Sequence, residues 1–97
     1  MAKKIYISGR ITGVKNYKKI FERASDHLIS MGYKVVNPAC MDDVMPNASY
    51  EDYMKVDMYL LDDCDSVYML KGWEQSVGAI RELGFALGKG KEIIFEN

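Results

Sequence analysis

Residue types that commonly bind metals or form nucleophilic triads are scarce in this sequence. It contains one histidine, His27, and two cysteines, Cys40 and Cys64, which lie far apart and in no metal-binding spacing. Neither a Cys/His zinc site nor a Ser-His-Asp triad is therefore well supplied. We expect both cysteines to be reduced and structural, and we expect no metal and no other cofactor.

A long apolar run and an excess of positive charge are also absent. No apolar run approaches the ~20 residues that a membrane span needs. The 13 Lys and Arg residues are balanced by 14 Asp and Glu residues, for a formal net charge of −1. This balance argues against binding of a nucleic acid polymer but is compatible with a small anionic ligand. The segment Met1-Ala2-Lys3-Lys4 leads directly into a predicted strand, with no visible signal peptide. We therefore expect a cytoplasmic protein with no membrane partner.

Strand-like and helix-like segments alternate along the chain. Its length of 97 residues is typical of a single domain (1–97). β-branched and aromatic residues predict strands at 4–8, 33–36, 65–70 and 92–95. Apolar residues at helical spacing predict helices at 17–31, 49–64 and 76–91, whereas 39–48 is expected to be an irregular loop. This order predicts an α/β fold with a small doubly wound (flavodoxin- or Rossmann-like) parallel sheet, strand order 2-1-3-4, and helices on both faces. Ligands of such sheets bind beyond the carboxyl ends of the strands, here near residues 8–13 and 71–76.

The most informative residue is Glu82, in the last predicted helix. Its neighbours at three- and four-residue spacing carry no charge; they are Gly78, Ala79, Phe85 and Ala86. A carboxylate amid apolar and glycine surface is costly unless another group compensates it. A carboxylate at the edge of a ligand crevice is also what a covalent glycosyl nucleophile requires.

Asp57 is a second unusual carboxylate, because it falls within the apolar stripe of the 49–64 helix. That stripe consists of Tyr53, Val56, Leu60, Leu61 and Cys64. Asp57 could occupy a boundary position and reach solvent past the tyrosine. It could instead face the crevice as a partner of Glu82, since two carboxylates in different environments can divide nucleophile and proton-donor roles.

Several other residues near the predicted crevice allow two interpretations each. Ser76 could hold a phosphate at a helix N-terminus or only cap the helix. Arg10 could neutralise an anion or be an ordinary exposed arginine. Tyr6 could point to either face of the sheet, and Trp73 could stack on a nucleobase or cover the core. Together with Gly9 and Gly78, the residues Ser76, Arg10 and Trp73 form the candidate substrate-binding set.

These residues belong to a pattern that covers nearly the whole chain. The pattern is Tyr6-Ile7-Ser8-Gly9, Asn16-Tyr17, Gly32-Tyr33-Lys34-Val35-Val36-Asn37-Pro38, Asp57, Cys64-Asp65, Gly72-Trp73-Glu74-Gln75-Ser76-Val77-Gly78-Ala79 and Glu82. It resembles the nucleoside 2-deoxyribosyltransferase-like superfamily and, within it, a small uncharacterised group, the DUF4406 family.

The resemblance implies a role for each of four residues. The glutamate at the place of Glu82 attacks the anomeric carbon of a 2-deoxyribonucleoside. The serine six residues earlier, Ser76, holds a 5′-phosphate in relatives that hydrolyse nucleoside monophosphates. Asp57 helps to protonate or position the base, and Tyr6 lies beside the nucleophile. The 9–13 loop carries fewer polar groups than the phosphate loop of those hydrolases, so the free nucleoside and its monophosphate both stay open.

The resemblance therefore predicts an enzyme, a nucleoside deoxyribosyltransferase or deoxynucleotide N-glycosidase, that acts on a small-molecule nucleoside or nucleotide. Two alternatives stay open: a non-catalytic nucleotide-binding module and an assembly domain of the same fold. We also expect a homo-oligomer, because a small four-stranded sheet leaves edges and apolar surface that association would cover.

Overall fold

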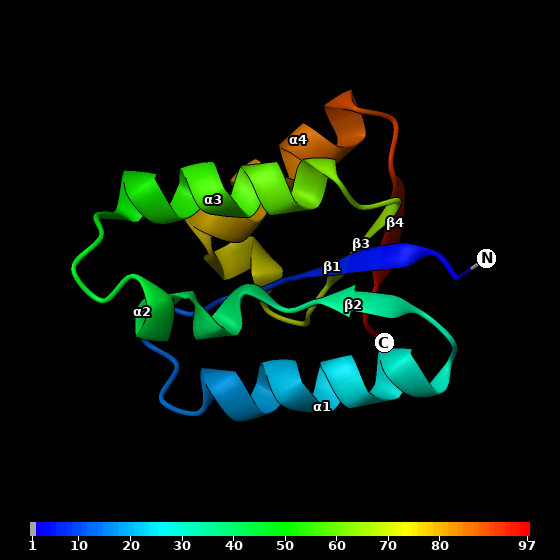
Figure 1. Cartoon of the computed structure of the whole chain (residues 1–97), viewed down its shortest axis with the longest axis horizontal. Helices are drawn as coiled ribbons and strands as arrows, with labels where there is room; N and C mark the ends of the chain where they lie inside the picture. Colours follow the sequence, from blue (N-terminus) through cyan, green and yellow to red (C-terminus); the bar gives the residue numbers. More distant parts are fainter. Residues whose placement is uncertain (1) are drawn as a thin grey trace.

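Four parallel strands form the centre of the structure, a computed structural model that describes residues 2–97 (Figure 1). They are β1 (Lys4–Ser8), β2 (Lys34–Val36), β3 (Ser66–Met69) and β4 (Glu92–Phe95). The sheet order is β2-β1-β3-β4, with Tyr6 opposite Val36 on one side and Val67 on the other. The structure therefore confirms the predicted small doubly wound α/β fold and its strand order.

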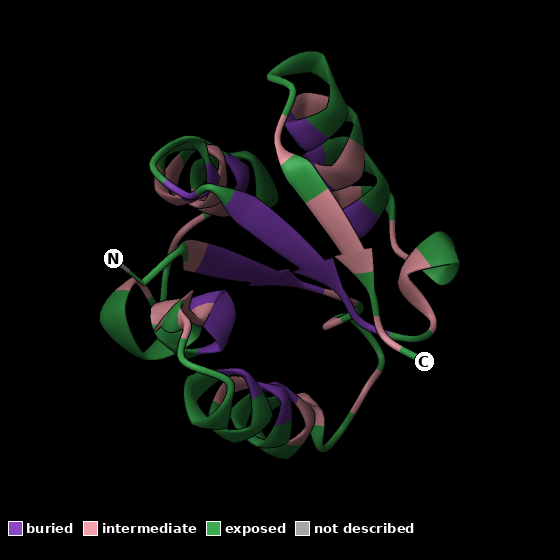
Figure 2. Cartoon of the chain, turned by 90° about the vertical axis from the view of Figure 1, so that its right-hand side faces the viewer, coloured by how far each residue is buried: buried purple, intermediate pink, exposed green. Residues whose placement is uncertain are grey.

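The helices cover both faces of this sheet. Helix α1 (Tyr17–Ser30) lies on one face, and α3 (Tyr50–Asp62) and α4 (Val77–Gly88) lie on the other (Figure 1). The central strands β1 and β3 are almost wholly buried, whereas the edge strands β2 and β4 are only partly covered (Figure 2). The most protected positions of the sheet are thus on the two strands whose carboxyl ends were expected to bind a ligand.

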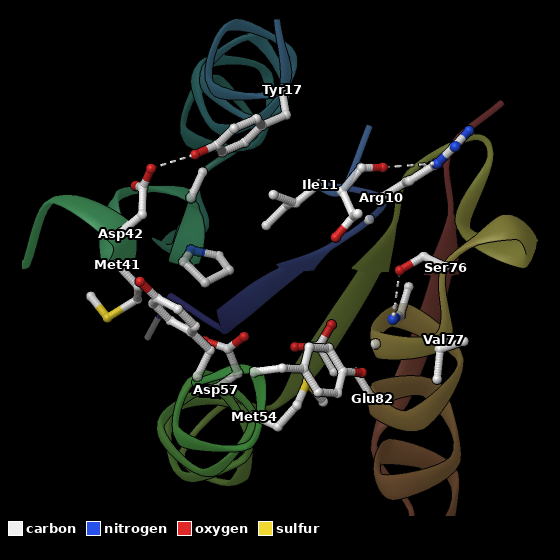
Figure 3. A pocket seen from close by; sticks show the side chains of 18 of the residues that line it. Arg10, Ile11, Tyr17, Met41, Asp42, Met54, Asp57, Ser76, Val77 and Glu82 are labelled. Carbon is white, nitrogen blue, oxygen red and sulfur yellow. Dashed lines mark hydrogen bonds between the residues drawn. The ribbon is translucent and has the colours of Figure 1, made fainter. Parts of the chain in front are cut away.

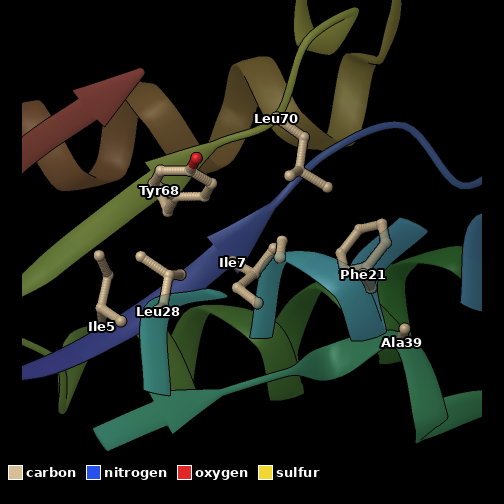
Figure 4. Packing of buried hydrophobic residues seen from close by; sticks show 8 residues of the cluster. Ile5, Ile7, Phe21, Leu28, Ala39, Tyr68 and Leu70 are labelled. Atoms are coloured by element: carbon tan, nitrogen blue, oxygen red, sulfur yellow. The ribbon is translucent and has the colours of Figure 1, made fainter. Parts of the chain in front are cut away.

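Period-two alternation on β1 decides which side chains reach each face. Ile5 and Ile7 point toward α1, where they join a buried cluster with Phe21, Ala24, Leu28, Ala39, Tyr68 and Leu70 (Figure 4). Tyr6 points to the opposite face and packs among residues of β3, α3 and α4. Ser8 shares that face with Tyr6, so two hydroxyl groups of β1 are directed toward α4.

The segment predicted to be an irregular loop contains two short helices. These are the 3₁₀-helix η1 (Pro38–Cys40) and the α-helix α2 (Met41–Val44). The side chain of Asn37 accepts a hydrogen bond from the Ala39 N–H at 3.0 Å, and Pro38 at the first position has no N–H to satisfy. Helix α2 has no buried residue of its own.

The buried stripe of α3 also differs from the prediction. Met54 and Leu61 are the buried residues of the helix, whereas Tyr53, Val56 and Leu60 are only partly buried. Residues 54, 57 and 61 follow helical spacing, so Asp57 lies between the two residues that face inward. The expected capping box is present: Ser49 accepts from the Asp52 N–H at 3.1 Å, and Asp52 accepts from the Ser49 N–H at 3.0 Å.

Helices α3 and α4 are held together at both ends. Near their N-terminal halves, Arg81 of α4 pairs with Glu51 of α3 at 2.9 Å. Past their C-terminal ends, Lys91 donates to the carbonyl oxygens of Asp62 and Cys64 at 2.9 Å and 2.6 Å. These contacts link α3, which carries Asp57, to α4, which carries Glu82.

Both cysteines are free thiols, Cys40 exposed and Cys64 buried. Within residues 2–97, each helix is too short or too polar to cross a membrane.

Candidate functional site

A pocket of about 600 Å³ opens at the carboxyl edge of the sheet (Figure 3). The 9–12 segment after β1, the start of α4 and the inward face of α3 form one part of its wall. The ends of α1, η1 and α2 form the other part. Its lining is Gly9, Arg10, Ile11, Thr12, Tyr17, Pro38, Ala39, Met41, Asp42, Tyr50, Tyr53, Met54, Asp57, Gln75, Ser76, Val77, Gly78, Ala79 and Glu82.

Glu82 lies in the wall of this pocket and is only 5% exposed. Its carboxylate accepts a hydrogen bond from the Tyr6 hydroxyl at Oε2, 2.5 Å, and another from the Ser8 hydroxyl at Oε1, 2.6 Å. Burial raises the pKa of Glu82 to about 7, although these two hydrogen bonds oppose the shift and the Asp57 charge adds to it. Two hydroxyls of β1, rather than a cation, thus compensate the buried carboxylate.

The structure therefore directs Tyr6 toward Glu82. Burial, and next the charge of Glu82, raise the pKa of Tyr6 well above its usual range, so the phenol stays protonated and continues to donate. Ser8 was missed as a site residue by the sequence prediction. The available signal was its two-residue spacing from Tyr6 on the same strand, which puts both hydroxyls on one face.

Asp57 also lines the pocket, close enough that its charge raises the pKa of Glu82. Its side-chain atom Oδ1 is buried without a hydrogen-bond partner among the described residues. Burial raises the pKa of Asp57 to about 6, and the Tyr6 phenol opposes that shift. The site thus brings together two carboxyl groups whose pKa values both lie near neutral pH.

Ser76 and Gly78 lie where α4 begins. The Ser76 oxygen accepts the Ala79 N–H at 3.1 Å, so this serine caps the helix. A methyl group added to Gly78 would lie 3.4 Å from the Tyr50 hydroxyl and 3.8 Å from the Ser76 oxygen. These are ordinary van der Waals distances, and because Ser76, Gly78 and Ala79 line the pocket, the first turn of α4 forms part of its wall.

Arg10 is an exposed residue at the pocket rim. Its guanidinium donates to the Gln75 side chain at 2.8 Å and to the Thr12 carbonyl at 3.2 Å, so it bridges the loop after β1 to the segment before α4. Gly9, also in the lining, has a packing role. A Cβ at Gly9 would lie 2.7 Å from Cδ1 of Leu70, so the closely spaced ends of β1 and β3 require a glycine.

Trp73 is outside the pocket lining. Its ring lies 5.8 Å from that of Phe95, and the side chain packs against the core cluster beneath α4. The structure therefore brings Glu82, Asp57, Tyr6, Ser76, Gly9, Arg10 and Gly78 together at one site, and places Trp73 elsewhere.

The pocket also contains residues that the sequence prediction did not include. Tyr17 and Asp42 form a hydrogen-bonded pair, with Met41 and Tyr53 near them. These residues come from α1, α2 and α3, and the prediction of a loop at 39–48 concealed their convergence. Among the His, Cys, Asp and Glu residues of the described chain, no group of three or more is arranged to hold a metal ion.

A search of curated proteins found no match to this sequence. The model of the family described as a domain of unknown function, DUF4406, matches residues 3–95. Because this match covers nearly the whole chain, the protein belongs to the DUF4406 family.

Proposed function

We propose that the protein binds a 2-deoxynucleoside or its 5′-monophosphate in this pocket and cleaves its N-glycosidic bond, with Glu82 as a covalent nucleophile. The deoxyribosyl group is then transferred to water or to a second base. The observation that carries the proposal is the buried Glu82 carboxylate, oriented by Tyr6 and Ser8 and facing a pocket beside the unpartnered oxygen of Asp57. The resemblance of the sequence to the nucleoside 2-deoxyribosyltransferase-like superfamily supports the choice of substrate class.

In the first step, one oxygen of Glu82 attacks the anomeric carbon of the deoxyribose. The bond from that carbon to the base nitrogen breaks, and its electron pair leaves with the base while Asp57 supplies a proton to the base. Each Glu82 oxygen accepts one hydrogen bond in the structure and retains a second lone pair for the attack. The two hydroxyls hold the nucleophile in a fixed orientation before the substrate arrives.

In the second step, water or a second base attacks the same carbon and displaces the Glu82 oxygen. Asp57, now ionised, takes the proton from the incoming nucleophile. Protonation activates the leaving base, so the proposed chemistry requires no cofactor. The two carboxyl groups thus return to their starting protonation states after each turnover.

The starting state of this cycle has the proton on Asp57 and the charge on Glu82. Burial raises the pKa of both groups, to about 6 for Asp57 and about 7 for Glu82. Two carboxyl groups that titrate in the same range and interact with each other share protons as a coupled pair. The proposed cycle uses the form of this pair in which Asp57 carries the single proton.

The start of α4 is the proposed phosphate position. The Ser76 oxygen accepts the capping N–H, so its own hydrogen is free to be donated to a ligand. Arg10, at the same side of the pocket, adds a positive charge near that position (Figure 3). A 5′-phosphate bound there would place the sugar between Ser76 and Glu82.

The test is incubation of the protein with a panel of deoxynucleosides and their 5′-monophosphates, followed by chromatography for released base and mass spectrometry of the protein. Turnover together with a deoxyribosyl adduct on the Glu82 peptide supports the proposal. E82Q should release no base, whereas E22Q, a matched change on the exposed face of α1, should behave as wild type. Ligand-dependent thermal stabilisation without base release would instead indicate a non-catalytic nucleotide-binding module. No response to any compound would favour the assembly domain.

A further inference from the structure

One end of the pocket takes no part in the chemistry proposed above. Tyr17, Met41 and Asp42 lie on the side of the pocket opposite Arg10 and Ser76 (Figure 3). A ligand whose phosphate lies at Ser76 and whose sugar lies at Glu82 would extend its base toward this end. The side chains of the α1–α2 end therefore determine which groups on the base can be bound.

The hydrogen-bond directions at this end are fixed by the protein. The Tyr17 hydroxyl donates to Oδ2 of Asp42 at 2.7 Å, and the Tyr53 hydroxyl donates to the backbone carbonyl of Met45 at 2.5 Å. A phenol has one proton, so both hydroxyls can only accept a hydrogen bond from a ligand. The hydroxyl protons of Tyr17 and Tyr53 are thus already used within the protein, and only the oxygen lone pairs of these residues are available to a ligand.

Asp42 is an acceptor as well. The hydrogen bond from Tyr17, and secondarily the Lys18 ammonium 3.5 Å away, lower the pKa of Asp42, so it is ionised at neutral pH. An ionised carboxylate has no proton to donate. Lys18 is not part of the pocket lining. Tyr17, Tyr53 and Asp42 therefore offer a ligand acceptors and no donor.

The remaining surface at this end is apolar and suited to a planar ring. It comprises Ile11, Pro38, Ala39 and Met41. Such a surface stabilises any base without distinguishing one from another. Among the side chains of α1 and α2 in the pocket lining, the polar groups that can distinguish bases are the Asp42 carboxylate and the phenol oxygen of Tyr17.

We propose that the α1–α2 end of the pocket selects an amino-bearing nucleobase, whose exocyclic amine donates to Asp42, over the base with a carbonyl at the same position. A carbonyl oxygen there would face the lone pairs of Asp42 and Tyr17 without a hydrogen bond, whereas an amine supplies the missing donor. This inference rests on the proposed function for the placement of the sugar and phosphate.

The test is equilibrium binding of dCMP against dUMP, and of dAMP against dIMP, by calorimetric titration. These pairs differ chiefly in exchange of an amine for a carbonyl. Wild-type protein should bind the amino member of each pair about tenfold more tightly. This difference is at the low end of the range for a hydrogen bond to a charged group, because the Asp42 side chain is half exposed to water. D42N should lose this preference, because an amide can turn its NH₂ group toward a carbonyl. Y17F should reduce it, because the phenol that orients Asp42 is removed.

D43N is the matched control. Asp43 is the next residue, pairs with the same lysine at 3.1 Å and lies outside the pocket lining, so the change in charge is the same. D43N should keep the wild-type preference. Thermal melting of each variant confirms that it is folded, and Y17F tests the proposal without a change in charge.

The outcomes separate this inference from the proposed reaction. Equal affinities within each pair, or a preference that survives in D42N, would overturn the inference and leave the glycosidic chemistry unaffected. A preference that is lost in D42N, in a protein that releases no base, would support the inference and refute the chemistry. Failure of all four nucleotides to bind would overturn both.

Discussion

Replacement of Glu82 by glutamine should stabilise the protein by an amount that grows with pH. The carboxyl group has a pKa of 4.5 in its ordinary state and about 7 in the folded protein, because it is buried. Between these two values the folded protein keeps the proton that the unfolded chain has released. The free energy of unfolding of the wild type therefore falls as the pH rises through this range.

The magnitude follows from the difference between the two pKa values. Below pH 4.5, Glu82 is protonated in both the folded and the unfolded state. Glutamine has a similar shape and, like the protonated carboxyl group, a donor on one of its two terminal atoms. The free energy of unfolding of E82Q should therefore differ little from that of wild type at this pH. Above pH 7, the folded protein holds an ionised carboxylate in its interior. The free energy of unfolding of the wild type is then lower, by about 3 kcal/mol, than at a pH where Glu82 is protonated in both states. Tyr6 can continue to donate to the amide oxygen of glutamine, and Ser8 can rotate its hydroxyl to accept from the amide NH₂, so both hydroxyls keep a partner at position 82.

The assay is urea denaturation of wild type and E82Q at pH 4, 6 and 8. E82Q should be about equal to wild type at pH 4 and more stable by about 3 kcal/mol at pH 8. Comparison with E22Q removes contributions from exposed carboxylates, because Glu22 remains in water in both states. A difference between E82Q and wild type that is independent of pH would refute the reasoning. So would a loss of stability in E82Q at pH 8.

Three further predictions follow from the same geometry. D57N should keep nucleotide binding, lose most base release, and shift the acid limb of any remaining rate profile to lower pH, because the Asp57 charge raises the pKa of Glu82. S76A should lose about 1 kcal/mol of stability as a helix cap, measured by denaturation, and should weaken binding of monophosphates by about 1–3 kcal/mol, measured by titration. G9A should lose about 1–3 kcal/mol of stability because of contact with Leu70, whereas G84A, at an exposed position of α4 with open space around it, should gain up to about 1 kcal/mol.

Each of these predictions has an opposing outcome. Unchanged turnover in D57N would remove Asp57 from the proposed mechanism. Equal losses for nucleoside and monophosphate in S76A would show that Ser76 is only a cap. A G9A protein as stable as wild type would mean that the ends of β1 and β3 separate easily.

The elements that the sequence predicted well are those with strong local signals. Strand β1 begins and ends at the predicted residues because the β-branched and aromatic run at 4–8 is followed by glycine. The capping box of α3 needs only the contacts between Ser49 and Asp52. Helix α2 escaped prediction because it has four residues, no buried side chain, and partners far away in the sequence, such as Tyr17 and Lys18 of α1.

The site residues that the sequence predicted were likewise those with a signal confined to one element. Glu82 stood out because its helical neighbours carry no charge, a property of one helix. The orientation of Asp57 could not be decided, because it depends on whether Met54 and Leu61 or Val56 and Leu60 face the sheet. That choice is made by packing across elements. Ser8 was inconspicuous because a small hydroxyl residue at the end of a strand is common on any surface.

The absence of buried side chains in α2 has a consequence for how this pocket can change. Substitutions in an exposed four-residue helix cost little stability, because no core contact is lost. At the other wall, the hydroxyls of β1 hold Glu82, and the contacts of Arg81 and Lys91 link α4 to α3. Ligand preference could therefore drift within the DUF4406 family, or be redesigned in the laboratory, by rewriting residues 41–44 while the remainder of the chain stays as it is.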